Sequence, residues 1–305
     1  MSLDWLAYYK QTVKKSTYIR GRTNVKRLNE AFGRLDFNKL TAAHFNKYFM
    51  DNLMNERFKY NTMKQIRSIV DRIIKHALKY HGIDKTEILI QLEVPKINVT
   101  VKDDFKYLEP DELNAILEYF KEQNMNEFAR LVTLQVNTGM RFGEMVALDY
   151  EADIDLDEQS IHITKNYDMD NKIFTTPKTG DSRTIYFGDD IKKLIMDQIQ
   201  YNRIKILKDN LDRGNKLLFS TKNGTPIRTG TMNKYLKRVD LDKNVTTHIF
   251  RHTFITHAVQ NGMSKELIAQ QVGHTDTSMI DKIYFHFTET MRKQQKEAML
   301  DFKII

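Results

Sequence analysis

The sequence predicts a mainly α-helical protein with a small antiparallel β-sheet, an α+β chain in two domains. Apolar residues recur every three or four positions over much of the chain, as in amphipathic helices. Short β-branched segments separated by turn residues are confined to 154–187. The length of 305 residues suggests about two domains. We therefore expect an N-terminal helical bundle followed by a mixed, mostly helical domain.

The first domain, residues 1–93, is expected to be a bundle of four helices. In the clearest of these, basic residues fall between the apolar positions. Thr41 is a suitable N-cap for the third helix, and Gly82 is a suitable end for the fourth. The helices are expected over 3–13, 18–32, 41–54 and 61–80. The apolar stripe of the fourth consists of Met63, Ile66, Ile69, Val70, Ile73, Ile74, Ala77 and Leu78.

Residues 94–108 are expected to be an extended linker, because they contain Pro95 and β-branched residues and lack helical periodicity. The second domain, 109–305, begins with a helix, since Pro110 suits a first turn and the acids around it favour the positive end of a helix. Helices are expected over 112–121, over 127–136 and in most of the chain from 191 onward. Strands are expected over 154–156, 161–164, 173–175 and 184–187.

The composition excludes several classes of protein. With no cysteine, the chain has no disulfide scaffold, thiol nucleophile, cysteine-ligated zinc or iron–sulfur cluster. No apolar segment approaches the roughly 20 residues that span a bilayer, and the N-terminus lacks the features of a signal peptide. P-loop and G-x-G-x-x-G motifs are also missing. We expect a soluble cytoplasmic protein that does not bind a membrane.

Charge is distributed in three blocks. The chain has 48 Lys and Arg against 40 Asp and Glu, a net charge of +8. Residues 1–100 carry +10, residues 101–190 carry −11, and residues 191–305 carry +9. Clustered Lys and Arg can neutralise the phosphates of nucleic acid and release its counterions. The basic blocks therefore favour a nucleic-acid partner over a surface that only confers solubility.

Three short segments carry groups that suit phosphoryl chemistry. In the first, a glycine-containing turn delivers Arg141 to the start of a helix. In the second, Lys178 lies at a predicted hairpin turn. In the third, His248 and Arg251 are three residues apart and therefore share one face of a helix. The segments are 137–144 (NTGMRFGE), 176–183 (TPKTGDSR) and 247–253 (THIFRHT).

A fourth segment, 272–276 (VGHTD), contains His274 and is followed ten residues after it by Tyr284. The spacing of His248 and His252 is also found in zinc sites, but the H-E-x-x-H motif requires an acid that this chain lacks. We therefore expect no metal ion and no cofactor.

In this order and spacing, the four segments resemble the tyrosine recombinases, also called the phage integrase family. The T-G-x-R-x-x-E, H-x-x-R and G-H boxes and the later tyrosine are present. The P-K-T-x-x-S-R segment is similar to the hairpin that carries the family's lysine. At motif level the resemblance covers 108–290. Residues 1–93 resemble the family's core-binding (SAM-like) DNA-binding domain more loosely, and 109–305 correspond to the catalytic domain with a C-terminal tail helix.

The resemblance implies a site-specific DNA recombinase, or integrase, that works through a covalent 3′-phosphotyrosyl intermediate. The tyrosine is then the nucleophile, and the two arginines bind the non-bridging oxygens of the scissile phosphate. The lysine protonates the leaving 5′ oxygen, the first histidine takes the proton of the tyrosine, and the second hydrogen-bonds the phosphate. The implied catalytic residues are Arg141, Lys178, His248, Arg251, His274 and Tyr284.

Several assignments stay open. Lys165 and Lys172 lie on neighbouring strands and are alternatives to Lys178 as the general acid. Glu144, at the family's acidic position, is expected to orient its neighbours and to take no part in the chemistry. A type IB topoisomerase-like enzyme would use the same groups without site specificity. A DNA-binding relative with an inactive site is the other rival, although the presence of all six groups argues against it.

The resemblance also implies double-stranded DNA as the partner and a homotetramer assembled on it. An accessory directionality factor or a host DNA-bending protein is consistent with the family, as is a place in the bacterial cytoplasm or nucleoid. The expected role is integration or excision of a phage or mobile element. Two features stay open: an arm-binding domain ahead of the first helices, and the docking of a tail helix over 288–300 on a neighbouring protomer or on its own domain.

Overall fold

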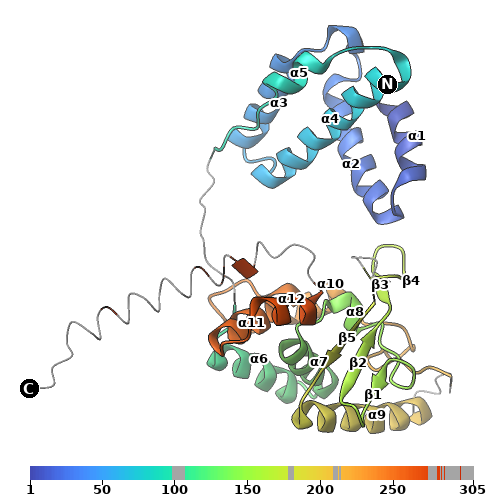
Figure 1. Ribbon diagram of the computed structural model, residues 1–305, viewed down its shortest axis with the longest axis vertical. Coiled ribbons are helices and arrows are strands. Elements are labelled where there is room, and N and C mark those ends of the chain that lie inside the picture. Colours follow the sequence, from blue (N-terminus) through green and yellow to red (C-terminus); the bar gives the residue numbers. More distant parts are fainter. Residues whose placement is uncertain are drawn as a thin grey trace, which may run out of the picture. The chain divides into compact units, whose positions relative to one another are not determined.

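The computed structural model describes residues 1–97, 107–177, 182–208, 212, 214–273, 280, 281, 283, 285 and 296. The chain divides into two compact units, Met1–Asp103 and Asp104–Ile305. Helices dominate both units and the strands form small antiparallel sheets, which confirms the predicted fold class (Figure 1). None of the described helices is long and apolar enough to cross a bilayer.

The first unit contains the four predicted helices, with ends that differ from the prediction by a few residues. Thr41 is the N-cap of the third, as predicted, and its backbone N–H donates to Nδ1 of His44 at 3.2 Å. The sequence did not predict the short helices η1 and α5. The elements are α1 (Ser2–Thr12), α2 (Lys15–Phe32), η1 (Phe37–Lys39), α3 (Ala42–Met54), α4 (Tyr60–His81) and α5 (Thr86–Gln91).

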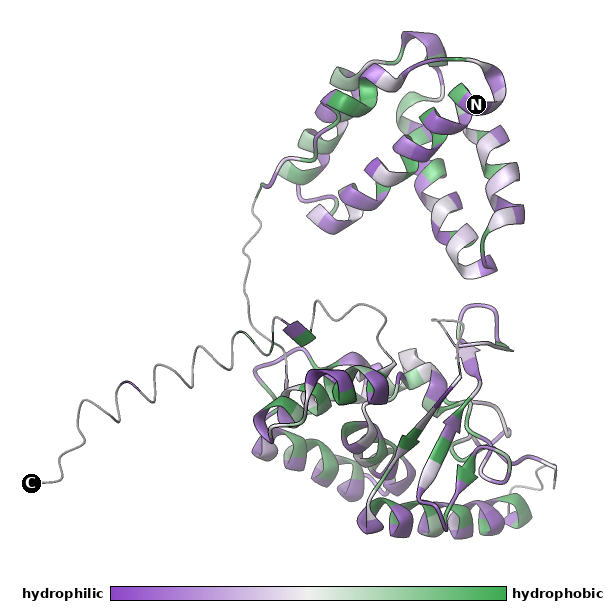
Figure 2. Cartoon of the chain, in the orientation of Figure 1, coloured by the Kyte–Doolittle hydropathy of each residue, from purple (hydrophilic) through white to green (hydrophobic). Residues whose placement is uncertain are grey.

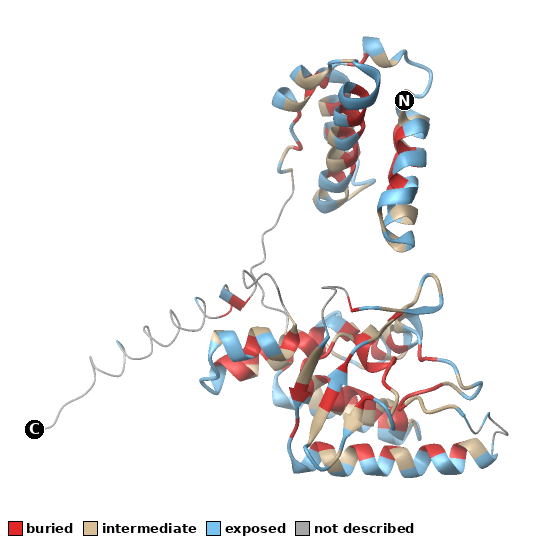
Figure 3. Cartoon of the chain, turned by 45° about the vertical axis from the view of Figure 1, so that its right-hand side comes forward, coloured by how far each residue is buried: buried red, intermediate tan, exposed pale blue. Residues whose placement is uncertain are grey.

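The core of the first unit forms around α4. Its apolar stripe is buried as predicted except at Leu78, which is 40% exposed. Gly82 ends the helix in the left-handed region, with φ at +65°, which glycine adopts without a steric penalty. Hydrophobic residues lie along the inner faces of these helices in Figure 2, and the same faces are buried in Figure 3. The other core residues include Trp5, Tyr9, Val25, Leu28, Phe45, Phe49 and Leu53.

The second unit contains both predicted helices before the strands, and several helices after them. Its first helix begins at Pro110, and Glu109 caps it by donating its backbone N–H to Glu112 at 2.8 Å. The helices are α6 (Pro110–Glu122), α7 (Asn126–Thr138), α8 (Phe142–Met145), α9 (Asp189–Lys208), α10 (Thr229–Leu236), α11 (Thr247–Gln260) and α12 (Lys265–Val272).

The strands of the second unit form two antiparallel sheets, where one was predicted. A three-stranded sheet has the order β1-β2-β5, with Ile161 opposite Ile185, and a separate hairpin pairs β3 with β4. The short strand β3 was not predicted. The strands are β1 (Ile154–Asp155), β2 (Ser160–Ile163), β3 (Asn166–Asp168), β4 (Ile173–Thr175) and β5 (Arg183–Tyr186).

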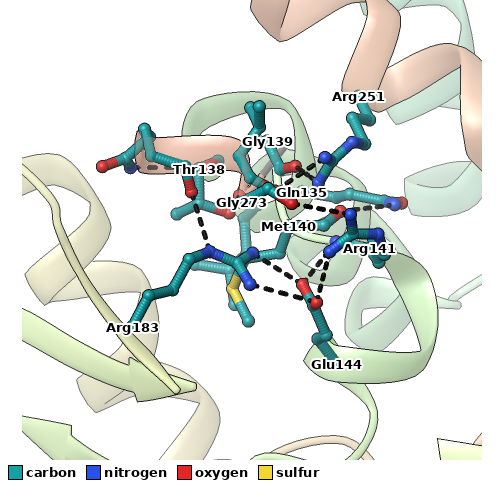
Figure 4. Close-up of polar contacts among 12 residues, drawn as sticks. Gln135, Thr138, Gly139, Met140, Arg141, Glu144, Arg183, Arg251 and Gly273 are labelled. Atoms are coloured by element: carbon teal, nitrogen blue, oxygen red, sulfur yellow. Dashed lines mark hydrogen bonds and ion pairs between the residues drawn. The ribbon is translucent and has the colours of Figure 1, made fainter. Parts of the chain in front are cut away.

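Helix α7 is central to the second unit, because it packs against α6, α9 and α11 and buries Leu131, Val132 and Leu134. Helix α12 packs against both α11 and β5. The C-terminal end of α7, the short helix α8, the start of β5 and the end of α12 therefore come together, although they are far apart in the sequence (Figure 4).

The boundary between the units falls within the predicted linker, 94–108. Val94 is buried in the core of the first unit, and Leu108 is fully buried in the core of the second. The backbone N–H of Leu108 also donates to the hydroxyl of Thr253 at 3.0 Å. The first residue of the predicted linker thus packs into the core of the first unit, and its last residue packs into the core of the second.

Candidate active site

A glycine turn connects α7 to α8 and sets the position of Arg141. Gly139 ends α7 with φ at +65°, where its N–H donates to the carbonyl of Gln135 at 2.9 Å. A Cβ at Gly139 would lie 2.4 Å from a ring carbon of Phe254, so a larger residue does not fit. Arg141 follows two residues later as the N-cap of α8. This is the arrangement that the sequence predicted.

The guanidinium of Arg141 is held from two sides. Nη1 donates to Oε1 of Glu144 at 2.8 Å, and Nη2 donates to the carbonyl of Gly273 at 2.8 Å. The side chain is 20% exposed. Arg141 is therefore fixed in orientation but still accessible to a ligand.

Arg251 lies on α11 and is 5% exposed. Its Nη1 donates to the carbonyl of Gly139 at 2.7 Å, and Nη2 donates to the carbonyl of Val272 at 2.6 Å. Burial, followed by the charge of Arg141, lowers the pKa of Arg251 to about 9. Arg251 is still a cation at neutral pH, and a phosphate bound beside it would favour that charged form.

Three arginines donate to three consecutive backbone carbonyls at the end of α12. The carbonyls of residues 271, 272 and 273 accept from Arg183 at 3.2 Å, Arg251 at 2.6 Å and Arg141 at 2.8 Å. The free carbonyls at a helix C-terminus carry partial negative charge, which favours nearby cations. Gly273 has φ at +67°, and a Cβ there would lie 2.7 Å from the guanidinium carbon of Arg183. The end of α12 therefore gathers the cationic groups.

Glu144 lies between two of these arginines and its side chain has no exposed surface (Figure 4). Arg183 binds it through both nitrogens, with Nη1 to Oε1 at 3.1 Å and Nη2 to Oε2 at 2.7 Å. Burial on its own raises the pKa of Glu144, but the hydrogen bonds and charge of Arg183, and then of Arg141, outweigh it and lower the pKa. Glu144 is thus ionised at neutral pH and holds both guanidiniums.

The chain matches a known protein family. The model of the phage integrase family matches residues 106–291, which is more than half of the chain and includes every residue of this site. The chain belongs to the phage integrase family. Its members are tyrosine recombinases, a class of DNA strand transferases.

Curated relatives agree with the family assignment. The integrase of Staphylococcus phage L54a is 27% identical to this chain, over 97% of this chain and 90% of its own length. A probable integrase of prophage ps2 of Lactococcus lactis is also 27% identical, over 95% of this chain and 79% of the relative. The tyrosine recombinase XerD of Staphylococcus saprophyticus is 25% identical over 82% of this chain and 79% of its own.

Solved structures share the fold. The Tn1549 transposon integrase, in complex with transposon right end DNA, superposes with a TM-score of 0.78 at 18% identity, over 97% of this chain and 99% of that chain. A lambda integrase dimer bound to a COC′ core site gives a TM-score of 0.68 at 16% identity, over 92% of this chain and 76% of that chain. The fold is thus that of the phage integrase family.

Three of the six predicted catalytic residues lie in the described part of this integrase-family fold. Arg141 and Arg251 meet at the end of α12, as described above. His248 is exposed in the first turn of α11, one turn before Arg251. Burial, followed by the charges of His248 and Arg251, lowers the pKa of the neighbouring His252. The other three predicted residues, Lys178, His274 and Tyr284, lie outside the described residues, as does almost all of the predicted tail helix.

The alternatives to Lys178 have other surroundings. The amine of Lys165 lies 3.0 Å from Oδ2 of Asp153 in an ion pair. Lys172 is exposed in the turn between β3 and β4, with φ at +55°. The ion pair engages the amine of Lys165, and the choice among the three lysines stays a prediction.

The sequence placed Arg183 in the hairpin segment without assigning it a function. A signal was present, because alternate residues of a strand share a face, and Ile185 of β5 is fully buried. Arg183 therefore points to the inside, where an arginine needs an acidic partner. Glu144 is that partner. We infer that Arg183 is a positioning residue, which holds Glu144 and through it orients Arg141.

Replacing Arg183 with methionine is expected to lower the free energy of unfolding by about 1–3 kcal/mol, because Glu144 and the carbonyl of Gln271 lose a buried donor. Strand cleavage is expected to fall by about 10- to 100-fold, because Arg141 is less firmly held. Chemical denaturation and a cleavage assay at a temperature where the variant is folded measure the two effects. The Arg183→Lys variant should have a stability and a cleavage rate between those of the wild type and of Arg183→Met. Wild-type cleavage by the folded methionine variant would refute the positioning role.

Proposed function

We propose that this phage integrase family member is a site-specific DNA recombinase that cleaves and rejoins strands through a covalent 3′-phosphotyrosyl intermediate. The observation that carries the proposal is the convergence of Arg141 and Arg251 on the carbonyls of residues 272 and 273. Those carbonyls directly precede His274 of the G-H box. Two guanidiniums at one place suit a phosphodiester, whose two non-bridging oxygens share its negative charge.

In the proposed cleavage step, the phenol oxygen of Tyr284 attacks the scissile phosphorus and the 5′ oxygen leaves. His248 accepts the phenolic proton, and Lys178 gives a proton to the leaving oxygen. Arg141 and Arg251 bind the two non-bridging oxygens, where negative charge increases in the transition state.

The second histidine, His274, donates a hydrogen bond to the same phosphate. Rejoining runs these steps in reverse, with the 5′ hydroxyl of a new strand as the nucleophile. The phosphotyrosyl bond retains the energy of the phosphodiester, so the reaction needs no nucleotide cofactor.

Duplex DNA is the proposed substrate and partner. The Tn1549 and lambda integrases of matching fold were solved with DNA. Residues 1–100 of this chain carry +10, and 191–305 carry +9, which suits binding to a phosphate backbone. We further propose a homotetramer on DNA and a role in integration or excision of a phage or other mobile element, in keeping with the phage and prophage relatives.

The experiment uses a nicked suicide duplex that carries a junction of the genetic element encoding this protein. Cleavage beside the nick releases a short fragment and traps the covalent protein–DNA adduct. We expect adduct with the wild-type protein and none with Tyr284→Phe, which lacks the nucleophilic oxygen. A matched control, Tyr186→Phe, removes the hydroxyl of an exposed tyrosine on β5 and should leave adduct formation unchanged.

The same reagents separate the two rival functions. A type IB topoisomerase-like enzyme relaxes a supercoiled plasmid that lacks any junction sequence, whereas a site-specific recombinase needs the junction. A relative with an inactive site binds the junction but gives no adduct. Adduct formation by Tyr284→Phe would show that the nucleophile is a different residue.

A further inference from the structure

Three side chains of the first unit meet where α1 packs against α4. Nε2 of His76 lies 2.9 Å from Oδ2 of Asp4, and Nε2 of His81 lies 2.7 Å from the same oxygen. One ligand atom from each of the three residues lies within 4.8 Å of the other two. His76 is buried, whereas Asp4 and His81 are exposed, so the group can be reached from solvent.

We propose that Asp4, His76 and His81 bind a divalent transition-metal ion, with Zn²⁺ as the ion that suits them best. Two imidazoles and one carboxylate are common zinc ligands, and a water molecule can complete the tetrahedron. Mg²⁺ and Ca²⁺ require mainly oxygen ligands, which this group does not supply. The proposal is independent of the catalytic site and of the chemistry proposed for it.

The distances from Asp4 to the two histidines fit zinc coordination after a small shift of the side chains. Zinc bonds of about 2.0–2.1 Å place tetrahedral ligand atoms about 3.3 Å apart. The two contacts of Asp4 are shorter than that, so the carboxylate and the imidazoles have to separate by about 0.5 Å. Asp4 lies in the first turn of α1 and His81 is the last residue of α4. Both side chains are exposed at helix ends, where such a shift meets little resistance.

The charge of Asp4 and the buried nitrogen of His76 both bear on metal binding. Hydrogen bonds from His76 and then from His81 lower the pKa of Asp4, so its carboxylate is charged. Nδ1 of His76 is buried and has no hydrogen-bond partner, so the doubly protonated imidazolium would leave one N–H unsatisfied. Metals bind the neutral form of an imidazole. Coordination through Nε2 moves its proton to Nδ1, a cost that the metal–nitrogen bond has to exceed.

Aromatic rings hold the buried ligand in place. The ring of Tyr8 lies 5.3 Å from that of His76, and the ring of Tyr80 lies 4.7 Å from it, between centroids. These contacts restrict the rotation of the imidazole and keep Nε2 directed at Asp4. Because Asp4 is 72 residues from His76 in the sequence, a bound ion would join α1 to the end of α4. We therefore expect a bound metal ion to stabilise the packing of α1 on α4 in the first unit.

The test is titration of the full chain with ZnCl₂ by calorimetry, and with Co²⁺ by visible absorption. We expect Zn²⁺ to bind Asp4, His76 and His81 as one site per chain and to raise the melting temperature. His81→Asn and Asp4→Asn, both at exposed positions, should each weaken binding by at least about tenfold and remove the stabilisation by Zn²⁺. Tetrahedral Co²⁺ bands should appear with the wild type and be lost in both variants.

The matched control is His162→Asn, which alters an exposed histidine of the second unit that is hydrogen-bonded to Thr184. It should bind Zn²⁺ as the wild type does. His248→Asn tests the other histidine pair and should also leave this site intact. The proposal is overturned if the wild type binds no Zn²⁺, or if binding survives in His81→Asn and Asp4→Asn.

Discussion

Replacing Arg251 with lysine is expected to reduce strand cleavage by about 10²- to 10³-fold, the usual loss for one preorganised donor at a transition-state oxyanion. Lysine keeps the positive charge but lacks the planar guanidinium, which can donate two parallel hydrogen bonds. The arginine donates to the carbonyls of Gly139 and Val272 through different nitrogens, which fixes the plane of the group that we propose binds the phosphate. The rate of adduct formation on the suicide duplex at saturating DNA measures the effect.

The control for this substitution is Arg238→Lys, which makes the same change at an exposed arginine that packs over Tyr235. It should leave the cleavage rate unchanged. Melting curves of both variants separate a loss of folding from a loss of chemistry. If Arg251→Lys cleaves within about threefold of the wild-type rate, positive charge alone is enough for cleavage and the planar guanidinium is not required.

Replacing Glu144 with glutamine is expected to lower the free energy of unfolding by about 3–5 kcal/mol, the usual cost of removing one partner from a buried ion pair. Glutamine has nearly the same shape, so the change tests charge and not packing. Without the carboxylate, Arg141 and Arg183 face each other beside Arg251 with no negative side chain between them. The midpoint of urea denaturation at neutral pH, followed by a signal of the second unit, measures the effect.

The stability difference between the wild type and Glu144→Gln should depend on pH. Because the pKa of Glu144 is lower in the folded protein than in the unfolded chain, the unfolded state takes up its proton first as the pH falls. The stability difference should have its full size at pH values above the pKa of Glu144 in the unfolded chain, near 4.5. It should decline as the pH falls through the lower pKa of the folded protein. A difference that stays constant from neutral to acidic pH would contradict the role of charge.

Glu127→Gln is the matched control for this variant. Glu127 forms another buried ion pair of the second unit, in which the amine of Lys205 lies 2.8 Å from its carboxylate, and it makes no contact with the three arginines. Its replacement should also destabilise the protein. At a temperature where both variants are folded, however, only Glu144→Gln should impair strand cleavage.

Long amphipathic helices were the part of the fold that the sequence predicted best. The stripe of α4 runs from Met63 to Leu78, about four turns, so a single exposed exception such as Leu78 does not obscure it. Short elements were missed for the opposite reason. Helix α5 has six residues and strand β3 has three, too few for a period to repeat, and contacts with the rest of each unit determine them.

The site was predictable where local backbone geometry determines it. The glycine turn that orients Arg141 is encoded within a few residues, and the i, i+3 spacing places His248 and Arg251 on one helix. The partners of these groups were not predictable. Arg183 meets Glu144 from 39 residues away, and each of the three arginines also donates to a backbone carbonyl, a group that every residue has. No pattern of side chains could indicate them.

The three consecutive carbonyls at the end of α12 determine which sequence changes this segment tolerates. Residues 271 and 272 contribute backbone atoms to the arginines, so substitutions there preserve the acceptors, while Gly273 is restricted by its positive φ and by Arg183. A deletion or insertion of one residue within α12 would rotate the helix end by about 100° and displace all three acceptors together. Helix length therefore keeps the three acceptors in place, while the buried position of Val272 also requires an apolar side chain.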